Sequence, residues 1–275
     1  MGKNLSMVKE NIKINFLIMQ KWFHENHMVL NPGKCHYLVL GKRTNSDTID
    51  LNGTKLASSS YEKLLGVLID RDLSFDMHIK SLCKKAGQKL NALARISSYL
   101  THDQKRLLLN SVIKSQFSYC PLIWMFCSRS LNNLLNRIHE RALRLIHNDH
   151  VSSFQDILEM TKEKTIHQNN LESLAKEIYK FLNGLSPPIM HDAFMIRSNV
   201  YNIRNFQCLY STNKRTVKYG TETVTYRGPQ IWKLVPENTR NASSFGIFKK
   251  EIRNWKGEEC PCRICKTYIQ HVGLI

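Results

Sequence analysis

The chain has 275 residues, 42% of them hydrophobic and 23% charged, a composition that argues against global disorder. Its 40 lysines and arginines exceed its 22 aspartates and glutamates, and the net charge of +18 favours a polyanionic partner such as nucleic acid. No stretch reaches the roughly 18 uncharged apolar residues of a membrane span, so we expect no membrane partner.

Residues 1–74 are expected to hold one helix followed by a small antiparallel sheet. Apolar side chains at spacings of three and four predict a helix over 7–27. Asn52-Gly53, between two short β-type segments, is a strong signal for a hairpin turn. A continuous apolar run predicts one buried strand over 61–70.

Residues 75–184 are expected to form a helical bundle, because the spacing of apolar side chains becomes helical from Phe75 onward. Side chains suited to helix N-caps precede the later helices: Thr101 with Gln104, Ser130, Ser153, and Thr165 with Gln168. Ser186-Pro187-Pro188 then breaks the helical pattern.

Residues 185–275 are expected to form a small, mixed, basic C-terminal module. The stretch 223–226 carries a weak strand signal, and 245–255 predict a short basic helix that precedes a cysteine cluster. The whole chain is therefore predicted to be of the α+β class.

The C-terminal cysteines are candidate metal ligands. Two thiolates at the spacing of Cys262 and Cys265 can hold one zinc ion, and Cys260 and His271 are available to complete a set of four. The alternative is a tail of unligated thiols. The N-terminus lacks the plan of a secretory signal, so we expect the eight cysteines to be reduced.

Asp70 and Asp72 are the one close aspartate pair that a strand could point in the same direction. Nucleotidyl transfer needs clustered carboxylates that hold two metal ions. The pair comes at the end of a predicted strand, so a solvated turn or a helix cap is the favoured interpretation. The rival is a new metal site formed with Asp76.

Basic side chains are candidate nucleic-acid contacts, because ammonium and guanidinium groups neutralise phosphates and release counterions. They recur on three predicted helices: Lys80, Lys84, Lys85 and Lys89; Arg137, Arg141 and Arg144; and Lys249, Lys250 and Arg253. The alternative for each group is an ordinary solvated surface.

Short motifs run through most of the chain: Trp22-Phe23-His24-Glu25-Asn26, Leu30-Asn31-Pro32-Gly33-Lys34-Cys35, Leu64-Leu65-Gly66-Val67-Leu68-Ile69-Asp70, Ser118-Tyr119-Cys120-Pro121-Leu122-Ile123-Trp124, Arg137-Ile138-His139-Glu140-Arg141-Ala142-Leu143-Arg144 and Tyr226-Arg227-Gly228-Pro229-Gln230-Ile231-Trp232. Together they resemble the C-terminal part of the reverse transcriptase of LINE-type, non-LTR, Jockey-like retrotransposons. The resemblance implies the downstream half of a polymerase palm in 1–74 and a helical thumb in 75–184.

The resemblance also implies roles for two residues of the first segment. Lys34 matches the lysine that lies near the incoming nucleotide, and Gly66 matches the glycine of the primer grip. A compact cation suits a phosphate, and a glycine lets the backbone approach a nucleic-acid strand closely. Template-primer RNA or RNA–DNA duplex is the implied partner, in the nucleus or the cytoplasm.

The metal-binding aspartates of the family precede the helix at which this chain begins. We therefore expect a fragment that is inactive alone as an RNA-directed DNA polymerase, with magnesium belonging only to the complete enzyme. The missing polymerase half is a candidate partner. The alternative function is a relic or domesticated protein-interaction module without nucleic-acid function.

Overall fold

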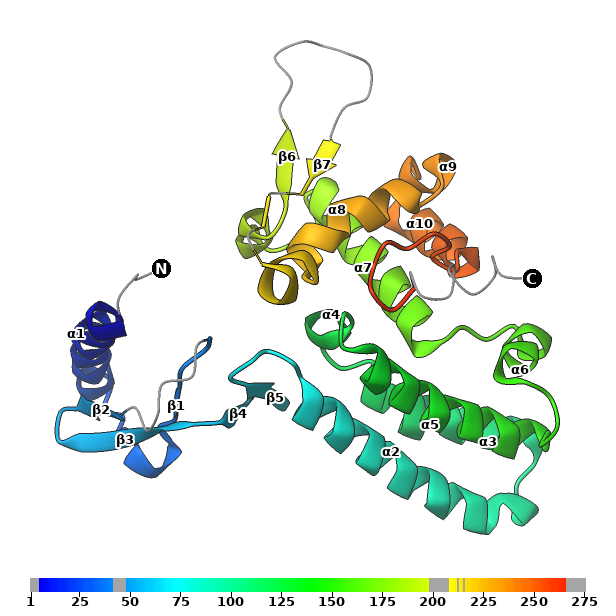
Figure 1. The fold of residues 1–275 in the computed structure, drawn as a ribbon, viewed down its shortest axis with the longest axis horizontal. Coiled ribbons are helices and arrows are strands. Elements are labelled where there is room, and N and C mark those ends of the chain that lie inside the picture. Colours follow the sequence, from blue (N-terminus) through cyan, green and yellow to red (C-terminus); the bar gives the residue numbers. More distant parts are fainter. Residues whose placement is uncertain (1–4, 42–47, 198–207, 212, 215, 266–275) are drawn as a thin grey trace. The chain divides into compact units, whose positions relative to one another are not determined.

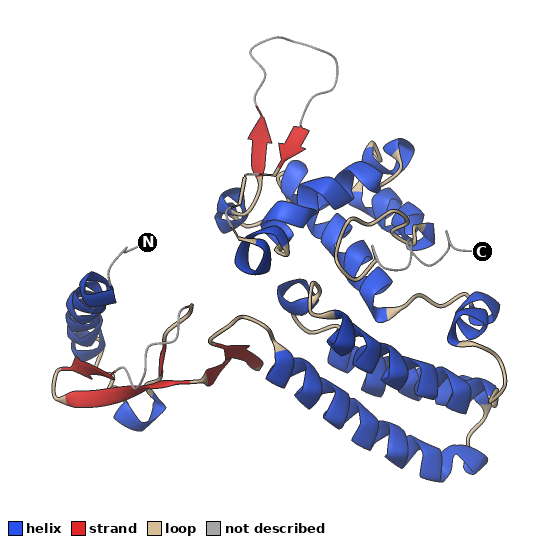
Figure 2. Ribbon diagram, viewed as in Figure 1, coloured by secondary structure: helices blue, strands red, loops and turns tan. Residues whose placement is uncertain are grey.

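The computed structural model describes residues 5–41, 48–197, 208–211, 213–214 and 216–265 (Figure 1). These residues are mostly helical with three small sheets, consistent with the α+β class (Figure 2). The chain divides into two compact units, Met1–Met77 and His78–Ile275. Within the described residues, no helix combines the length and the apolar character needed to cross a bilayer.

The first unit packs one helix on a small sheet. Its elements are α1 (Leu5–Glu25), the 3-10 turn η1 (Pro32–Lys34), β1 (Tyr37–Leu38), β2 (Thr48–Leu51), β3 (Thr54–Ser59), β4 (Tyr61–Leu64) and β5 (Val67–Asp70). The helix buries Phe16 against Tyr37, Ile49 and Leu51 of the sheet. β2 and β3 are antiparallel, but β1 pairs with β3 in parallel, so the expectation of a purely antiparallel sheet is wrong in that respect.

The turn at Asn52-Gly53 is confirmed. Asn52 has φ 54° and Gly53 has φ 87°, so both central residues lie in the left-handed region that a two-residue hairpin turn requires. The side chain of Asp50 accepts a hydrogen bond from the Gly53 amide at 2.9 Å. This turn sets the register that pairs Leu51 with Thr54.

The single buried strand expected over 61–70 is wrong, because the segment is a second hairpin, β4 and β5. Leu65 and Gly66 have φ values of 46° and 90° and form its two-residue turn. The backbone reverses at Gly66, so the apolar run is divided between two strands and a solvent-exposed tip. Leu65 is 83% exposed, whereas Val67 is buried.

One face of α1 is apolar and exposed. Ile14, Leu17, Ile18 and Trp22 are 56%, 54%, 64% and 53% exposed, respectively. They recur at spacings of three and four and therefore form one stripe along the helix. The sheet covers the other side of α1 through Phe16, whereas the described residues of the first unit leave this stripe exposed.

The second unit is built from helices. Its first part contains α2 (Asp76–Ile96), η2 (Ser97–Tyr99), α3 (His102–Leu108), η3 (Leu109–Ile113), η4 (Lys114–Phe117), α4 (Pro121–Trp124), α5 (Arg129–His147), α6 (Phe154–Thr161) and α7 (Ile166–Leu182). The capping boxes at Thr101 and Thr165 and the cap at Ser153 are confirmed. The cap of α5 is Ser128 rather than Ser130, because the Ser128 hydroxyl accepts from the Leu131 amide.

The remaining elements of the second unit are η5 (Pro188–Asp192), β6 (Met195–Arg197), β7 (Cys208–Tyr210), η6 (Val217–Thr221), α8 (Val224–Leu234), α9 (Glu237–Arg240), α10 (Phe245–Glu251) and η7 (Ile252–Asn254). The strand expected over 223–226 is wrong, because these residues begin α8. Burial of Ile231 and Trp232 in the core outweighs the β-preference of the branched side chains at its start. The short basic helix expected over 245–255 is confirmed as α10 with η7.

Helix α7 is the element on which the second unit assembles. It contacts α4 and α5 from the first part of the unit and α8, α10 and η7 from the second part. Leu174, Ala175 and Ile178 on this helix are completely buried. The Tyr179 ring stacks on Phe248 at 4.3 Å between centroids, so α10 is held directly against α7.

Candidate functional site

Three cysteines lie in a loop that follows η7 and passes close to helix α7. Gly257 begins this approach with φ 70°, and a Cβ at that position would lie 2.4 Å from Cδ1 of Leu171. Only glycine tolerates both the left-handed backbone and this close contact. Ile264, 2% exposed, packs the end of the loop into the core of the unit.

Arg263 attaches the same loop to the connection between α4 and α5. Its guanidinium donates to the backbone carbonyl oxygens of Phe126 at 2.7 Å and of Cys127 at 3.0 Å. Backbone carbonyls left by a helix end need such donors. The loop is therefore held on both sides, by Gly257 against α7 and by Arg263 against the residues after α4.

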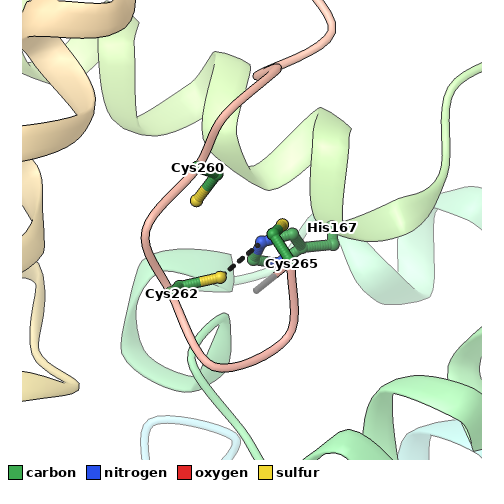
Figure 3. A group of neighbouring side chains, drawn as sticks. All are labelled: His167, Cys260, Cys262 and Cys265. Atoms are coloured by element: carbon green, nitrogen blue, oxygen red, sulfur yellow. Dashed lines mark hydrogen bonds between the residues drawn. The ribbon is translucent and has the colours of Figure 1, made fainter. Parts of the chain in front are cut away.

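Four potential metal ligands converge between this loop and the first turn of α7 (Figure 3). The Sγ atoms of Cys260, Cys262 and Cys265 and a ring nitrogen of His167 all lie within 4.8 Å of one another. His167 Nε2 is 3.3 Å from Cys262 Sγ. His167, Cys260 and Cys262 are buried, and Cys265 is half-buried. The cluster could hold a metal such as zinc, for which three thiolates and one imidazole are a common structural set.

The pKa values of the three thiols in the cluster shift in different directions. Hydrogen bonds from Cys260 and Cys265 hold the pKa of Cys262 well below its usual value. By contrast, burial raises the pKa of Cys127, which lies outside the group, to about 12. Hydrogen bonds within the group and burial raise the pKa values of Cys260 and Cys265 as well. Their position around His167, and not their pKa, therefore distinguishes the loop cysteines from Cys127 as candidate ligands.

The three predicted cysteine ligands are thus brought together, and the histidine beside them is His167. The predicted fourth ligand, His271, lies outside the described residues. His167 is 95 positions from Cys262 along the chain and has no local motif around it. The capping box at Thr165 predicts where α7 begins. It does not indicate that His167, the second residue of that helix, lies next to the cysteine loop.

The lysines of α2 lie on its outer surface. Lys80, Lys84, Lys85 and Lys89 are all exposed, opposite a buried face that includes Ile79, Ala86 and Leu90. Lys89 Nζ also donates to the Val112 carbonyl oxygen at 3.4 Å. Helix α2 therefore presents a strongly positive outer face.

The arginines of α5 differ in their surroundings. Arg137 and Arg141 are exposed, and Arg141 donates to Asn91 Oδ1 of α2 at 2.6 Å. Arg144 is half-buried and binds Glu140 and the Ser152 carbonyl oxygen within the bundle. The Arg144 guanidinium is therefore engaged by groups of the chain itself, whereas the Arg137 side chain is exposed to solvent.

The other predicted contacts lie at three separate places. Lys249, Lys250 and Arg253 are exposed on α10 and η7. Lys34 is exposed at the end of η1, and Gly66 is exposed at the tip of the β4–β5 hairpin.

Asp70 has a structural role in the turn before α2. Its carboxylate accepts hydrogen bonds from the backbone amides of Asp72, Ser74 and Phe75 at 3.0, 3.0 and 2.6 Å. These bonds confirm the interpretation of Asp70 as a turn residue. Among the residues that the structure describes, the His167 cluster is the one group of three or more potential metal ligands in contact.

A cavity of about 330 Å³ opens beside the bundle core. Its lining includes Lys114, His139 and Glu163, and the Lys114 ammonium pairs with Glu163 at 2.7 Å. His139 is 3% exposed, and neither ring nitrogen has a hydrogen-bond partner in the described part of the chain. Burial, with a smaller effect of Lys114, lowers the pKa of His139 to about 4.

Two curated proteins are similar to this chain in sequence. One is an RNA-directed DNA polymerase from the mobile element jockey of Drosophila funebris, 25% identical over 131 residues, which are 46% of this chain and 14% of that protein. The other is a probable RNA-directed DNA polymerase from the transposon BS of Drosophila melanogaster, 30% identical over 101 residues, which are 36% of this chain and 11% of that protein.

The matched stretch thus spans about an eighth of each relative's length. No protein-family model and no solved structure matches the chain. The resemblance carried by the motifs is confirmed: the chain is similar to the RNA-directed DNA polymerases of Jockey-like, non-LTR transposons.

Proposed function

We propose, from this similarity to the RNA-directed DNA polymerases of Jockey-like transposons, that the chain is the C-terminal part of such a polymerase and binds RNA or an RNA–DNA template-primer. The proposal assigns 1–74 to the downstream half of the palm, 75–184 to the thumb and 185–275 to a basic C-terminal module. It assigns the chain to the nucleus or the cytoplasm, where such elements are copied.

The observation that carries the proposal is the positive outer face of α2 next to α5. Lys84, Lys85 and Arg137 are exposed on these helices. A Cβ added to Gly87 of α2 would lie 3.7 Å from Cδ1 of Ile138 on α5. The hydrogen bond from Arg141 of α5 to Asn91 of α2 also joins the two helices, so these cations lie on neighbouring helices. Cations gathered in this way can neutralise phosphates, the main source of affinity for a duplex.

Lys34 and Gly66 enter the proposal through the resemblance. Both lie in exposed turns of the first unit, where a backbone or an ammonium group is accessible to a nucleic-acid strand. We assign Lys34 to the neighbourhood of the incoming nucleotide and Gly66 to the primer strand. The catalytic magnesium ions are assigned to the rest of the polymerase, because Asp70 is committed to its turn.

A zinc ion at the cysteine cluster is part of the proposal. Three thiolates and one imidazole within 4.8 Å match a closed structural zinc site, and the free thiols of Cys260, Cys262 and Cys265 are available as ligands. The ion would supply folding stability rather than catalysis, because four protein ligands leave no open position.

Salt-dependent binding tests the nucleic-acid proposal. Fluorescence anisotropy of a labelled RNA–DNA duplex should show affinity that falls steeply with salt, with a slope of about 0.9 per phosphate contacted. The double variant Lys84→Ala with Lys85→Ala should lower that slope by roughly 2.

The matched control is Lys63→Ala with Lys233→Ala, which removes the same charge from exposed positions on β4 and α8. It should leave the slope close to that of the unmodified chain. Equal effects of the two double variants would contradict a site on α2, and absence of binding by the folded chain would contradict the proposal altogether.

A second candidate function, protein interaction, rests on the exposed apolar stripe of α1. Ile14, Leu17, Ile18 and Trp22 are each more than half exposed, and a stripe of this kind is typical of a surface that another protein covers. The partner that fits is the preceding half of the polymerase. Titration with that half should show binding that Ile18→Glu weakens and that Lys21→Glu, on the same helix, leaves unchanged.

A further inference from the structure

We infer that His167 is the fourth zinc ligand and that the ion fastens the C-terminal cysteine loop to the start of helix α7. The inference rests on the zinc ion of the proposed function and is independent of nucleic-acid binding. It concerns which residues hold the ion and what the ion holds together. Figure 3 shows the imidazole directed from α7 toward the three thiols of the loop.

The geometry of the four side chains fits one tetrahedral ion. Zinc lies about 2.3 Å from sulfur and about 2.0 Å from an imidazole nitrogen, so ligand atoms of one site lie roughly 3.5 to 3.8 Å apart. His167 Nε2 and Cys262 Sγ are separated by 3.3 Å, and the whole set lies within 4.8 Å. Small side-chain rotations suffice to place one ion among all four.

The surroundings of His167 leave its ring in need of such a partner. The residue is 4% exposed, its Nδ1 has no hydrogen-bond partner in the described part of the chain, and its Nε2 faces a thiol. A thiol is a weak donor and a weak acceptor. A metal ion at Nε2 would compensate the burial of this nitrogen far better than the thiol does.

Independent features of the loop favour this pairing. Gly257 allows the chain to pass against Leu171 one helical turn beyond His167, and Arg263 holds two carbonyl oxygens after α4. The Phe126 and His167 rings also meet in a T-shaped arrangement, with 6.4 Å between centroids. Contacts that do not involve the four candidate ligands therefore hold the loop beside the start of α7.

Metal content tests the ligand set. The purified, reduced chain should retain one zinc ion, and cobalt substitution should give a thiolate-to-cobalt charge-transfer band. His167→Ala should weaken zinc affinity by more than roughly tenfold and shift the cobalt bands, while His167→Cys, which supplies a fourth thiolate, should restore affinity. The controls Cys127→Ala and His271→Ala should match the unmodified chain.

Trypsin cleavage after Arg263 tests the fastening role. With zinc bound, this bond should be cut at least about tenfold more slowly than after chelation or in His167→Ala, because local opening must precede cleavage. Cleavage after Lys34, in an exposed turn of the first unit, should not depend on zinc.

Two results would overturn the inference. If His167→Ala binds zinc as tightly as the unmodified chain and shows the same cobalt bands, the zinc proposal stands but His167 is not a ligand. If the reduced chain binds no zinc at all, the zinc proposal fails together with the inference. In both cases the binding of RNA–DNA duplex remains a separate measurement.

Discussion

Replacement of His139 should remove a defined part of the pH dependence of folding. His139 is buried on α5, and its ring meets the Phe154 ring in a T-shaped arrangement with 5.9 Å between centroids. Desolvation lowers its pKa from 6.5 to about 4, with Lys114 lowering it further and Glu163 opposing the shift. The folded chain therefore keeps this ring neutral in a range where the unfolded chain protonates it.

The size of the effect follows from these two pKa values. Because the folded pKa is depressed, the stability contributed by the neutral ring is complete above pH 6.5 and is lost as the pH falls through 6.5 toward 4. At pH 5 the histidine is mostly charged in the unfolded chain and mostly neutral in the folded chain. This pH lies about 1.5 units below the pKa of 6.5 in the unfolded chain. At 1.36 kcal/mol per unit, about 2 kcal/mol of unfolding free energy should be lost between pH 7.5 and pH 5.

Urea unfolding followed by circular dichroism at pH 7.5 and pH 5.0 measures this loss. His139→Leu should show a pH-dependent loss about 2 kcal/mol smaller than that of the unmodified chain. Any packing cost of leucine is common to both pH values and cancels in the comparison. His150→Leu, at an exposed position, is the control and should behave like the unmodified chain. If His139→Leu loses as much stability as the unmodified chain on acidification, the argument from burial is refuted.

Further predictions concern a cap, a thiol and a glycine. Ser128→Ala should lower the unfolding free energy by about 1 kcal/mol while Ser130→Ala changes it little, because Ser128 caps α5; chemical denaturation of both variants decides between them. Cys127, with a pKa raised to about 12, should react with iodoacetamide at pH 8 far more slowly than the half-buried Cys120, as mass spectrometry of the alkylated peptides would show. Gly257→Ala should lower the melting temperature and the zinc content together, since its Cβ would collide with α7; an unchanged zinc content would contradict this placement of the loop.

The parts of the fold that were predictable from sequence depend on local chemistry. Asn52-Gly53 sets a hairpin turn, and the hydroxyl of Thr165 caps a helix through an amide three residues later. Each signal lies within a few residues. The hairpin over 61–70 was missed because Leu65, a residue that seldom adopts positive φ, occupies its turn and hides it in an apolar run.

The site was predictable only as far as its local spacing. Cys260, Cys262 and Cys265 are identifiable because ligands within one loop must be close in sequence. His167 was not identifiable, because its meeting with the loop depends on how α7 packs against η7 and on the space that Gly257 leaves. The same packing explains the helix in place of a strand after Thr223, where the buried face of α8 against α7 decides the structure.

The separation of His167 from its cysteine partners has a consequence during protein synthesis. The helix that carries His167 is translated long before Cys265, so a growing chain can fold its α2–α7 helices while the cysteine cluster remains incomplete. The cluster is closed only when the last of the three cysteines has left the ribosome. A ribosome that stops before Cys265 would release a chain that lacks one of the four ligands. Without the ion that holds the loop to α7, such a chain should be degraded faster by proteases.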